Sequence, residues 1–290
     1  MELLTSVAAM RHAAESGRAH RGRVVLVPTM GALHAGHLKL VEEAGAQGDV
    51  VVVSVFVNPT QFGEGEDFDA YPRKLEADRK LLEDQGIATH LFAPTVSEMY
   101  PDGAVAQRTS VVVEKLTTTL CGAYRPGHFN GVTTVVTMLF EITKPHVAVF
   151  GQKDAQQLAV IRRMVRDLHM PVTIVGVPIV RESDGLALSS RNQYLSDEER
   201  AQAPVLYEAL QEAVAMVEEG ELLVEPLVVR MREIIDSAPL AEPQYISVVD
   251  ADSLDAVDQL NPGQQVLLAV AVYFGETRLI DNVRLTVPPE

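Results

Sequence analysis

The sequence predicts an α/β protein made of a doubly wound parallel sheet and a smaller C-terminal α+β domain. Through about the first 179 of its 290 residues, short β-branched runs alternate with longer amphipathic stretches. Residues 49–57 (DVVVVSVFV) form an almost continuous apolar run, which is typical of a strand that helices cover on both faces of a parallel sheet. Later the order changes to two helical stretches followed by three strand-like ones. We therefore predict a Rossmann-like domain over 1–179 and a second domain over 180–290.

The individual elements follow from the spacing of the apolar residues. In the first domain we expect strands at 23–27, 49–57, 146–150 and 172–177, and helices at 36–46, 75–85, 131–142 and 155–168. In the second domain we expect helices at 197–219 and 225–236 and a small mixed sheet formed by 244–249, 265–272 and 277–283. Ser196 and Glu199 have the spacing of a capping box at the start of the first of these helices.

The charge of the chain limits its partners. The formal net charge is −16, from 24 basic and 40 acidic residues. Because binding to nucleic acid or to anionic membranes requires Lys and Arg to neutralise phosphates, we expect neither partner. A phosphate-bearing ligand must instead find a local positive site, such as a compact pocket.

Other features predict a cytoplasmic protein. Cys121 is the sole cysteine, so no intramolecular disulfide can form, and we expect it to be a packed side chain and not a nucleophile. The first ten residues lack the pattern of a signal peptide. The apolar runs are shorter than the roughly 20 residues that a membrane helix needs.

The strongest local signal is residues 28–37 (PTMGALHAGH), which follow a predicted strand and open a predicted helix. A helix N-terminus offers free N–H groups and a partial positive charge, both suited to phosphate. His34 and His37 are three residues apart, so they could face one side and donate hydrogen bonds to a triphosphate. Gly36 would let a nucleotide approach the backbone. Ordinary loop histidines or half of a metal site are the alternatives, and a metal site lacks evident further ligands.

Two further polar segments follow strands at the same edge of the predicted sheet. In residues 57–63 (VNPTQFG), the amides of Asn58 and Gln61 can donate and accept, as a hydroxy acid requires; a simple turn is the alternative. In residues 151–157 (GQKDAQQ), Lys153 can neutralise phosphate and Gln157 lies one helical turn beyond it. An ordinary helix start explains this segment less well, because a cation in the first turn is disfavoured without an anion nearby.

Basic loops complete the set. Residues 188–192 (LSSRN) place two hydroxyls beside Arg191, whose guanidinium can bind phosphate bidentately. Arg125 lies in a second basic loop, and for both loops a polar interdomain loop is the alternative. Asp67, Asp69 and Asp78 could hold Mg²⁺ through water, although solvated carboxylates are the simpler interpretation for the first two.

Together, the segments PTMGALHAGH, FVNPTQF, YRPGHFNGV, GQKDAQQL and DGLALSSRN resemble the pantothenate synthetase family in order and spacing. The likeness covers essentially the whole chain. The H-x-G-H and Ser-Ser-Arg elements are also similar to the two signature motifs of class I aminoacyl-tRNA synthetases and related nucleotidyltransferases. The resemblance implies an ATP-dependent ligase that joins pantoate to β-alanine through pantoyl adenylate, with AMP and pyrophosphate as the other products. It also implies Mg²⁺, a homodimer, and a C-terminal domain that closes over the active site.

The resemblance further implies roles for single residues. The implied catalytic residues are His34, His37, Lys153 and Arg191. The implied ATP site consists of Met30, Gly31, Ala32, Leu33, His34, Ala35, Gly36, His37, Gly151, Gln152, Lys153, Asp154, Val180, Leu188, Ser189, Ser190 and Arg191. Gln61 and Gln157 would hold pantoate, Gln61 would also line the β-alanine path, and Asn58 and Arg125 would support them. Asp78 resembles a carboxylate associated with Mg²⁺, but Ala77 stands where some members are acidic. The family resemblance implies that His37 is a proton donor. From the chemistry alone, we expect stabilisation of charge by His37 equally.

Three other classes of protein share part of this pattern. A nucleotidyltransferase that leaves AMP or CMP on a phosphorylated acceptor shares H-x-G-H but does not need Gln61 and Gln157. A non-catalytic nucleotide-binding protein should have lost some of the charged motif residues, and all of them are present. A tRNA synthetase is disfavoured by the net charge and by the lack of an evident anticodon-binding domain.

Overall fold

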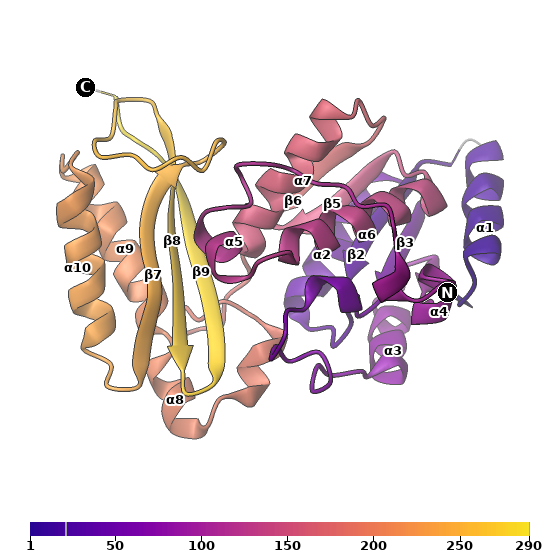
Figure 1. Cartoon of the computed structure of the whole chain (residues 1–290), viewed down its shortest axis with the longest axis horizontal. Coiled ribbons are helices and arrows are strands. Elements are labelled where there is room, and N and C mark those ends of the chain that lie inside the picture. Colours follow the sequence, from indigo (N-terminus) through magenta and orange to yellow (C-terminus); the bar gives the residue numbers. More distant parts are fainter. Residues whose placement is uncertain (21, 290) are drawn as a thin grey trace.

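The computed structural model describes residues 1–20 and 22–289 and contains two separate sheets (Figure 1). Within these residues the larger sheet has six strands in the order β1-β4-β3-β2-β5-β6, and every pair is parallel. The strands are β1 (Glu2–Leu4), β2 (Val24–Thr29), β3 (Val50–Val55), β4 (His90–Phe92), β5 (Val147–Gly151) and β6 (Thr173–Val177). The predicted doubly wound parallel sheet is confirmed.

Helices cover both faces of this sheet (Figure 1). They are α1 (Val7–Ala19), α2 (Ala35–Gln47), α3 (Leu75–Gln85), α4 (Val96–Met99), α5 (Leu120–Tyr124), α6 (His128–Thr143) and α7 (Ala155–Asp167). Because side chains alternate along a strand, Val24 and Leu26 of β2 join one apolar core, with residues of α1, α6 and α7. Val25 and Val27 join the other core, with residues of α2 and α3. This burial on both faces explains the continuous apolar runs in the sequence.

The smaller sheet is antiparallel, and the predicted mixed sheet is wrong. It consists of β7 (Ala241–Asp250), β8 (Gln265–Phe274) and β9 (Thr277–Thr286) in sequential order. Residues 275–276 form a tight turn from β8 to β9, and a short turn can only join antiparallel neighbours. The longer connection 251–264 leads from β7 to β8, which also pair antiparallel. Val266 and Leu268 of β8 pack with the C-terminal helices, whereas Leu267 and Ala269 pack with the core of the first sheet. The smaller sheet therefore lies between its own helices and the N-terminal part (Figure 1).

The C-terminal helices also correct one prediction. The single helix expected over 197–219 is two helices, α8 (Asp197–Gln202) and α9 (Val205–Glu218). Pro204 separates them because proline has no N–H to continue the ladder of α8 and its ring clashes with the preceding turn. The predicted capping box is present, since Ser196 and Glu199 cap each other's backbone N–H groups. The helix α10 (Val224–Asp236) follows, close to its predicted bounds.

The order of strands determines where a ligand can bind. From β2 the chain moves outward to β3 on one side, and β5 and β6 lie on the other side. The reversal between β2 and β5 is a topological switch point, where the loops at the carboxyl ends of neighbouring strands diverge and leave a crevice. The segment after β2 and the segment after β5 are two of the polar motifs found in the sequence.

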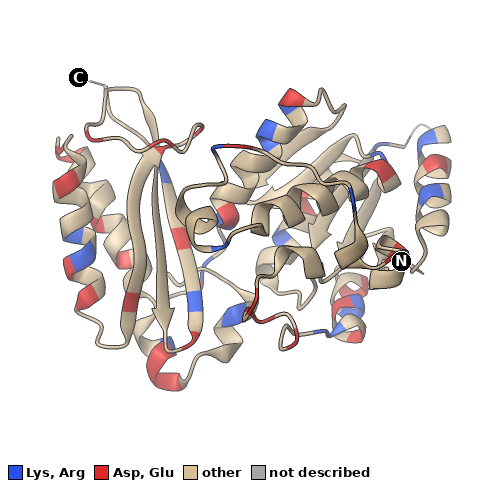
Figure 2. Cartoon of the chain, in the orientation of Figure 1, with Lys and Arg blue, Asp and Glu red and all other residues tan. Residues whose placement is uncertain are grey.

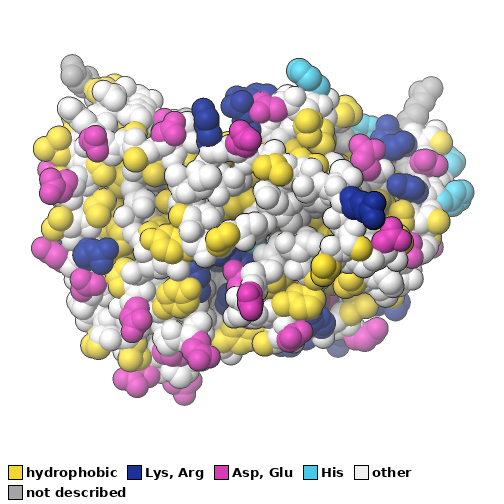
Figure 3. Space-filling view, viewed as in Figure 1, with side chains coloured by type: hydrophobic (Ala, Val, Ile, Leu, Met, Phe, Trp, Pro, Cys, Tyr) yellow, Lys and Arg dark blue, Asp and Glu magenta, His cyan; other side chains and the backbone are white. Residues whose placement is uncertain are grey.

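Charge is dispersed over the fold. Acidic and basic residues are mixed along the outer helices (Figure 2), and the face seen in Figure 3 has small groups of both signs among scattered apolar side chains. In the described part of the chain, the helices are too short or too polar to cross a membrane.

Candidate active site

Two histidines lie at the start of α2, in the crevice at the switch point. His34 is the N-cap residue, and its Nδ1 accepts a hydrogen bond from the N–H of Gly36 at 3.2 Å. The Nδ1 of His37 accepts from the N–H of His34 at 3.3 Å. Because each Nδ1 is an acceptor, each neutral ring carries its proton on Nε2. The two rings, 4.1 Å apart, thus provide two Nε2–H donors at a helix N-terminus.

The surroundings keep both rings neutral. Burial lowers the pKa of His34 from 6.5 to about 4, with a smaller contribution from the charge of Lys153. Burial likewise lowers the pKa of His37 to about 3, helped by His34 and Lys153. At pH 7 both side chains are therefore hydrogen-bond donors without a formal charge. Gly36 also leaves room for the ring of His34, since a Cβ at this position would lie 2.9 Å from Cε1 of His34.

The loop before α2 is held from behind by Asp78 of α3. Its Oδ2 accepts from the N–H of Ala32 at 3.0 Å and its Oδ1 from the N–H of Leu33 at 2.7 Å. Gly31 has φ +85°, and a Cβ there would lie 2.9 Å from Oδ2 of Asp78. Burial raises the pKa of Asp78, although the two N–H groups act in the opposite direction. Asp78 thus fixes the loop, and its exposed fraction is 3%.

Gln61 is positioned by Asn58 in the turn after β3. Asn58 is 1% exposed, and its Nδ2 donates to Oε1 of Gln61 and to the carbonyl of Gly131, both at 3.2 Å. Its Oδ1 accepts from the hydroxyl of Tyr100 at 2.7 Å. The contacts of Asn58 are thus with the protein interior. Nε2 of Gln61 lies 3.1 Å from Sδ of Met30, which brings the two predicted segments together.

Arg125 lines the crevice but is already paired. Its Nη2 lies 2.6 Å from Oε2 of Glu66, and its Nε lies 2.7 Å from Oε1 of the same carboxylate. Nδ1 of His128 donates to the carbonyl of Gln61 at 2.7 Å, which leaves Nε2 to accept from Nη1 of Arg125 at 3.1 Å. Burial and Arg125 lower the pKa of His128 to about 4, in agreement with a neutral ring. Arg125 and His128 together brace the backbone of Gln61.

Lys153 is the available cation in the crevice. It lies in the 3₁₀ turn Gln152–Asp154 between β5 and α7, and no carboxylate lies within 4 Å of its ammonium group in the described residues. Gln157 of α7 lines the same cavity. An unpaired ammonium group beside two Nε2–H donors produces a local positive site in a chain of net charge −16, as predicted from the charge.

The Ser-Ser-Arg segment closes one side of the crevice. Ser190 Oγ donates to the carbonyl of Ala32 at 3.3 Å, so two motifs 158 residues apart are in contact. Arg191 pairs with Asp67, with Nη2 2.9 Å from Oδ1 and Nε 3.1 Å from Oδ2. The carboxylate of Asp67, which the sequence suggested as a solvated side chain, therefore orients the guanidinium of Arg191.

These segments enclose a cavity of about 240 Å³. Most of the predicted residues line it, namely Met30, His34, Gly36, His37, Gln61, Arg125, Gly151, Lys153, Asp154, Gln157, Val180, Leu188, Ser189, Ser190 and Arg191. The others lie outside its lining: Gly31, Ala32, Leu33, Ala35, Asn58, Asp78 and Gln152. The sequence thus identified the polar wall of the cavity, while Asn58 and Asp78 support it from behind.

The apolar wall was missed. Val132, Val135, Val136 and Leu139 of α6 line the cavity together with Phe56. Their helical spacing was visible in the sequence, but a buried helix face and a cavity wall produce the same pattern. His128 and Tyr71 also line the cavity. The available signal for His128 was its place in the basic loop around Arg125 and in the segment YRPGHFNGV.

A wider cleft of about 1330 Å³ continues from this cavity toward the smaller sheet, and Lys153, Asp154 and Gln157 line both. At its far end Cys121 is buried, with Sγ 3.3 Å from the hydroxyl of Tyr245 and 3.4 Å from Nη2 of Arg278. The prediction that Cys121 is a packed side chain is confirmed. Its partners come from β7 and β9, so it belongs to the contact between the two parts of the chain.

A parallel sheet with an H-x-G-H helix start, a lysine turn and a Ser-Ser-Arg segment around one switch-point cavity defines the class of Rossmann-like α/β enzymes that handle nucleotides. The family model described as pantoate-beta-alanine ligase matches residues 2–284. The chain belongs to this family, and it is therefore an enzyme of the ligase class.

Similar proteins agree with this assignment. A pantothenate synthetase of Salinibacter ruber is 57% identical, with 100% of this chain and 99% of the relative covered. The crystal structure of pantothenate synthetase from Thermus thermophilus has a TM-score of 0.91 and 49% identity, with both chains covered completely. The pantoate-beta-alanine ligase of Francisella tularensis, solved with β-γ ATP and β-alanine, has a TM-score of 0.79 and 34% identity over 98% of this chain and 97% of that one.

Proposed function

We propose that this chain joins pantoate to β-alanine at the expense of ATP, through a pantoyl adenylate. The observation that carries the proposal is the meeting of two Nε2–H donors, an unpaired ammonium group and two side-chain amides in one cavity. The Francisella relative, which was crystallised with an ATP compound and β-alanine, supports the choice of substrates.

In the first step a carboxylate oxygen of pantoate forms a bond to the α-phosphorus of ATP. The bond from that phosphorus to the bridging oxygen breaks, and pyrophosphate leaves with the electron pair. Both reactants are anions, so positive groups must offset their repulsion. His34 and His37 donate from Nε2 and Lys153 provides the charge, while Gln61 and Gln157 hold the hydroxy acid against the apolar wall of α6. Removing one such donor typically slows a reaction by roughly 10²–10³-fold.

In the second step the amine of β-alanine attacks the acyl carbon. The bond from this carbon to the phosphate oxygen breaks, AMP leaves, and the amine loses a proton to form the amide. This step requires no contact with a triphosphate. The adenylate is hydrolysable, so a C-terminal domain that closes the wider cleft would protect it from water.

Mg²⁺ enters the proposal as an ion carried by ATP. Both oxygens of Asp78 already accept backbone N–H groups, and Asp78 lies outside the cavity lining, so its donor set does not fit a directly coordinated metal. The described residues also contain no cluster of three metal-ligating side chains. Mg²⁺ commonly keeps its waters and binds through substrate phosphates, where it would offset charge. We derive no step from a metal held by the protein.

Three further properties remain part of the proposal. The resemblance to the family suggests a homodimer, which the sedimentation velocity of the purified chain would test. It also suggests a cytoplasmic location and closure of a domain that begins near residue 180. Small-angle scattering with and without ATP and pantoate would measure closure, because closure reduces the radius of gyration.

Pyrophosphate exchange into ATP tests the reaction itself. The purified chain is given ATP, Mg²⁺ and pantoate without β-alanine, and the transfer of labelled pyrophosphate into ATP is measured. β-Alanine is then added. We expect exchange that depends on pantoate, followed by AMP and pantothenate in equal amounts.

The outcomes separate the competing functions. Release of pyrophosphate with no AMP after β-alanine is added would indicate a nucleotidyltransferase that leaves its nucleotide on the acceptor. A folded chain that binds ATP but catalyses no exchange would exclude pantoate as the acid, and the same assay would then be repeated with other carboxylates.

A further inference from the structure

Two adjacent polar residues of β9, Asp281 and Asn282, are nearly inaccessible to solvent. Their exposed fractions are 3% and 6%. A buried polar side chain is costly unless its hydrogen bonds are made, and both residues make theirs with segments of the N-terminal part or of the connection between the two parts. Neither residue belongs to a segment that carries the family resemblance.

Asn282 holds the turn that carries Lys153. Its Nδ2 donates to the carbonyl of Gln152 at 3.1 Å and to the carbonyl of Lys153 at 2.8 Å. A side-chain amide has two N–H donors, so this one group can serve both carbonyls. Two contacts to successive peptide units restrict both the position and the rotation of the turn Gln152–Asp154.

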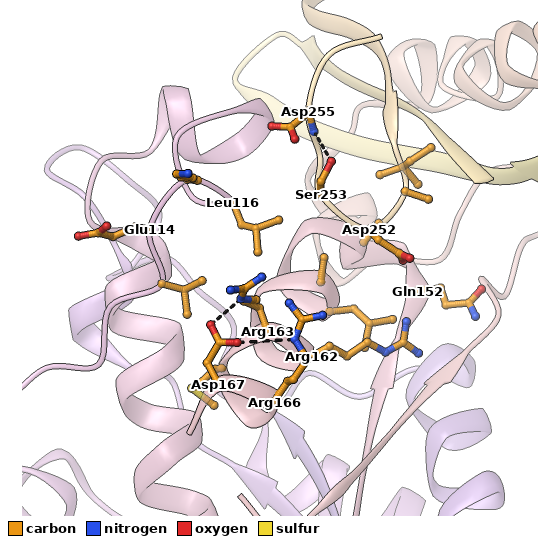
Figure 4. Close-up of a pocket in the computed structure, with 18 of the residues that line it drawn as sticks. Glu114, Leu116, Gln152, Arg162, Arg163, Arg166, Asp167, Asp252, Ser253 and Asp255 are labelled. Atoms are coloured by element: carbon orange, nitrogen blue, oxygen red, sulfur yellow. Dashed lines mark hydrogen bonds and ion pairs between the residues drawn. The ribbon is translucent and has the colours of Figure 1, made fainter. Parts of the chain in front are cut away.

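Open space lies on two sides of the turn, and its other side-chain hydrogen bond, from Nε2 of Gln152 to the carbonyl of Gly176, is longer at 3.4 Å. Lys153 borders the 240 Å³ cavity and the wider cleft. Gln152 borders a separate cavity of about 800 Å³, shown in Figure 4, between α7, residues 111–116 and the loop 251–255. Asn282 also lines this cavity. Packing does not confine the turn on these two sides, so the two shorter hydrogen bonds from the amide of Asn282 help to hold it against displacement.

Asp281 holds the second segment that faces the cavity. Its carboxylate binds Arg181 bidentately, at 2.6 Å to Nη1 and 2.9 Å to Nη2. Nη1 of Arg181 also donates to the carbonyl of Gly185 at 3.0 Å, and its guanidinium lies 3.8 Å from the ring of Tyr207. Arg181 thereby fixes the tight loop that leads into Leu188, Ser189, Ser190 and Arg191.

We propose that Asp281 and Asn282 are positioning residues, which set the separation between Lys153 and the Ser-Ser-Arg segment from the C-terminal sheet. This inference rests on the proposed function. The ammonium group of Lys153 sits on a flexible stem, so its reach is defined only if its backbone is fixed. Loss of Asn282 should therefore impair the step that uses the triphosphate, and it should leave the amide-forming step intact.

The test measures the two half-reactions separately. In Asn282→Ala we expect pantoate-dependent pyrophosphate exchange to fall roughly 10- to 100-fold, as for a misplacement of about 1 Å. Formation of pantothenate from synthetic pantoyl adenylate and β-alanine should stay within about twofold of the wild type. Arg284→Ala is the matched control: it lies on the same strand and loses an exposed pair with Asp252 at 2.7 Å, and both half-reactions should be unchanged.

A general loss of structure would lower both half-reactions together, and that result, or unchanged exchange, would overturn the inference. If Asn282→Ala does not fold, Asn282→Ser keeps one donor and should show an intermediate loss confined to exchange. Absence of exchange in the wild type would instead refute the proposed function.

A double-mutant cycle then asks whether Asn282 acts through Lys153. In the Lys153→Ala background, Asn282→Ala should reduce the residual single-turnover rate by less than about twofold, because the group that it positions is gone. Full additivity of the two losses is expected only for independent sites, and it would overturn the mechanism.

Discussion

The two histidines at the start of α2 act on charge in their neutral form. Their Nδ1 atoms accept hydrogen bonds from backbone N–H groups, and burial lowers the pKa to about 4 for His34 and about 3 for His37. A neutral Nε2–H group can stabilise a developing negative charge without giving up its proton. The structure of the free enzyme therefore supports charge stabilisation by His37, whereas a role as proton donor would require that bound ATP raise its pKa.

Replacing His37 should affect catalysis more than folding. We expect His37→Ala to reduce pyrophosphate exchange by roughly 10²–10³-fold, because a single donor to the transferring group is lost. His12→Ala changes an exposed histidine of α1 and serves as the control. Exchange rates and the circular dichroism of both variants check the prediction, and unchanged exchange in His37→Ala would remove this residue from the mechanism.

The same histidines predict how stability depends on pH. An unfolded histidine has a pKa near 6.5, while burial lowers the pKa of folded His37 to about 3. Below pH 6.5 the unfolded chain binds a proton at His37 that the folded chain does not bind. The contribution of this histidine to the free energy of unfolding is therefore fully present above pH 6.5 and is lost as the pH falls toward 4. In His37→Ala the free energy of unfolding should depend less steeply on pH. The slope should be smaller by at most about 1.4 kcal/mol per pH unit, the value for one proton. Urea unfolding between pH 8 and pH 4 measures it, and a slope identical to that of the wild type would contradict the burial of this ring.

The polar residues of the site could be predicted because they follow strand ends in a parallel sheet. Lys153 was predictable for a further reason, since a lysine beside the N-terminus of a helix, here that of α7, is unfavourable without an anion. Asn282 was not predictable: a polar residue at an alternate position of a strand has the pattern of a solvent-facing side chain. Its burial results from packing against a turn 130 residues away.

Among the loops and helices, Asp78 of α3 has the clearest structural role. We expect Asp78→Ala to leave two N–H groups of the loop before α2 without their acceptor, at a cost of about 1–3 kcal/mol in the free energy of unfolding. Exchange should fall, while the Mg²⁺ concentration for half-maximal exchange should not change, because both carboxylate oxygens serve the loop.

Asp84→Ala, an exposed position on the same helix, is the control for this change. A tenfold or larger rise in the half-maximal Mg²⁺ concentration of Asp78→Ala alone would instead support the role as a metal-associated carboxylate that the family resemblance implies.

Most long elements were predictable and short ones were not, but the 13-residue helix α1 was also missed, because it buries little more than Met10 and Ala14 and so has a weak apolar pattern. The strands β2, β3 and β5 are buried on both faces, and their apolar runs are unmistakable. The strands β1 and β4 have three residues each, too few for an alternating pattern to be recognised. Pro204 lies within an amphipathic pattern that continues on both sides of it. The spacing of the apolar residues alone therefore does not show the break between α8 and α9.

Across the whole molecule, the pair Arg181–Asp281 joins the last strand to the connection between the two parts. Its side chains are 16% and 2% exposed, so removal of one partner leaves a buried charge. We expect Asp281→Ala to lower the free energy of unfolding by about 3–5 kcal/mol. Asp252→Ala removes the exposed pair with Arg284, for which about 0–1 kcal/mol is expected. Urea denaturation of both variants measures the difference, and equal effects would show that burial does not strengthen this contact.

The position of β9 in the chain also bears on protein synthesis. A ribosome makes the histidines, the lysine turn and the Ser-Ser-Arg segment well before it reaches Asn282. A nascent chain that has just emerged as far as α10 therefore carries every side chain that faces the cavity, but not the amide that holds the lysine turn. Under the inference drawn from β9, adenylation by a growing chain reaches its full rate only when β9 has emerged and paired, and a chain released early would adenylate pantoate slowly.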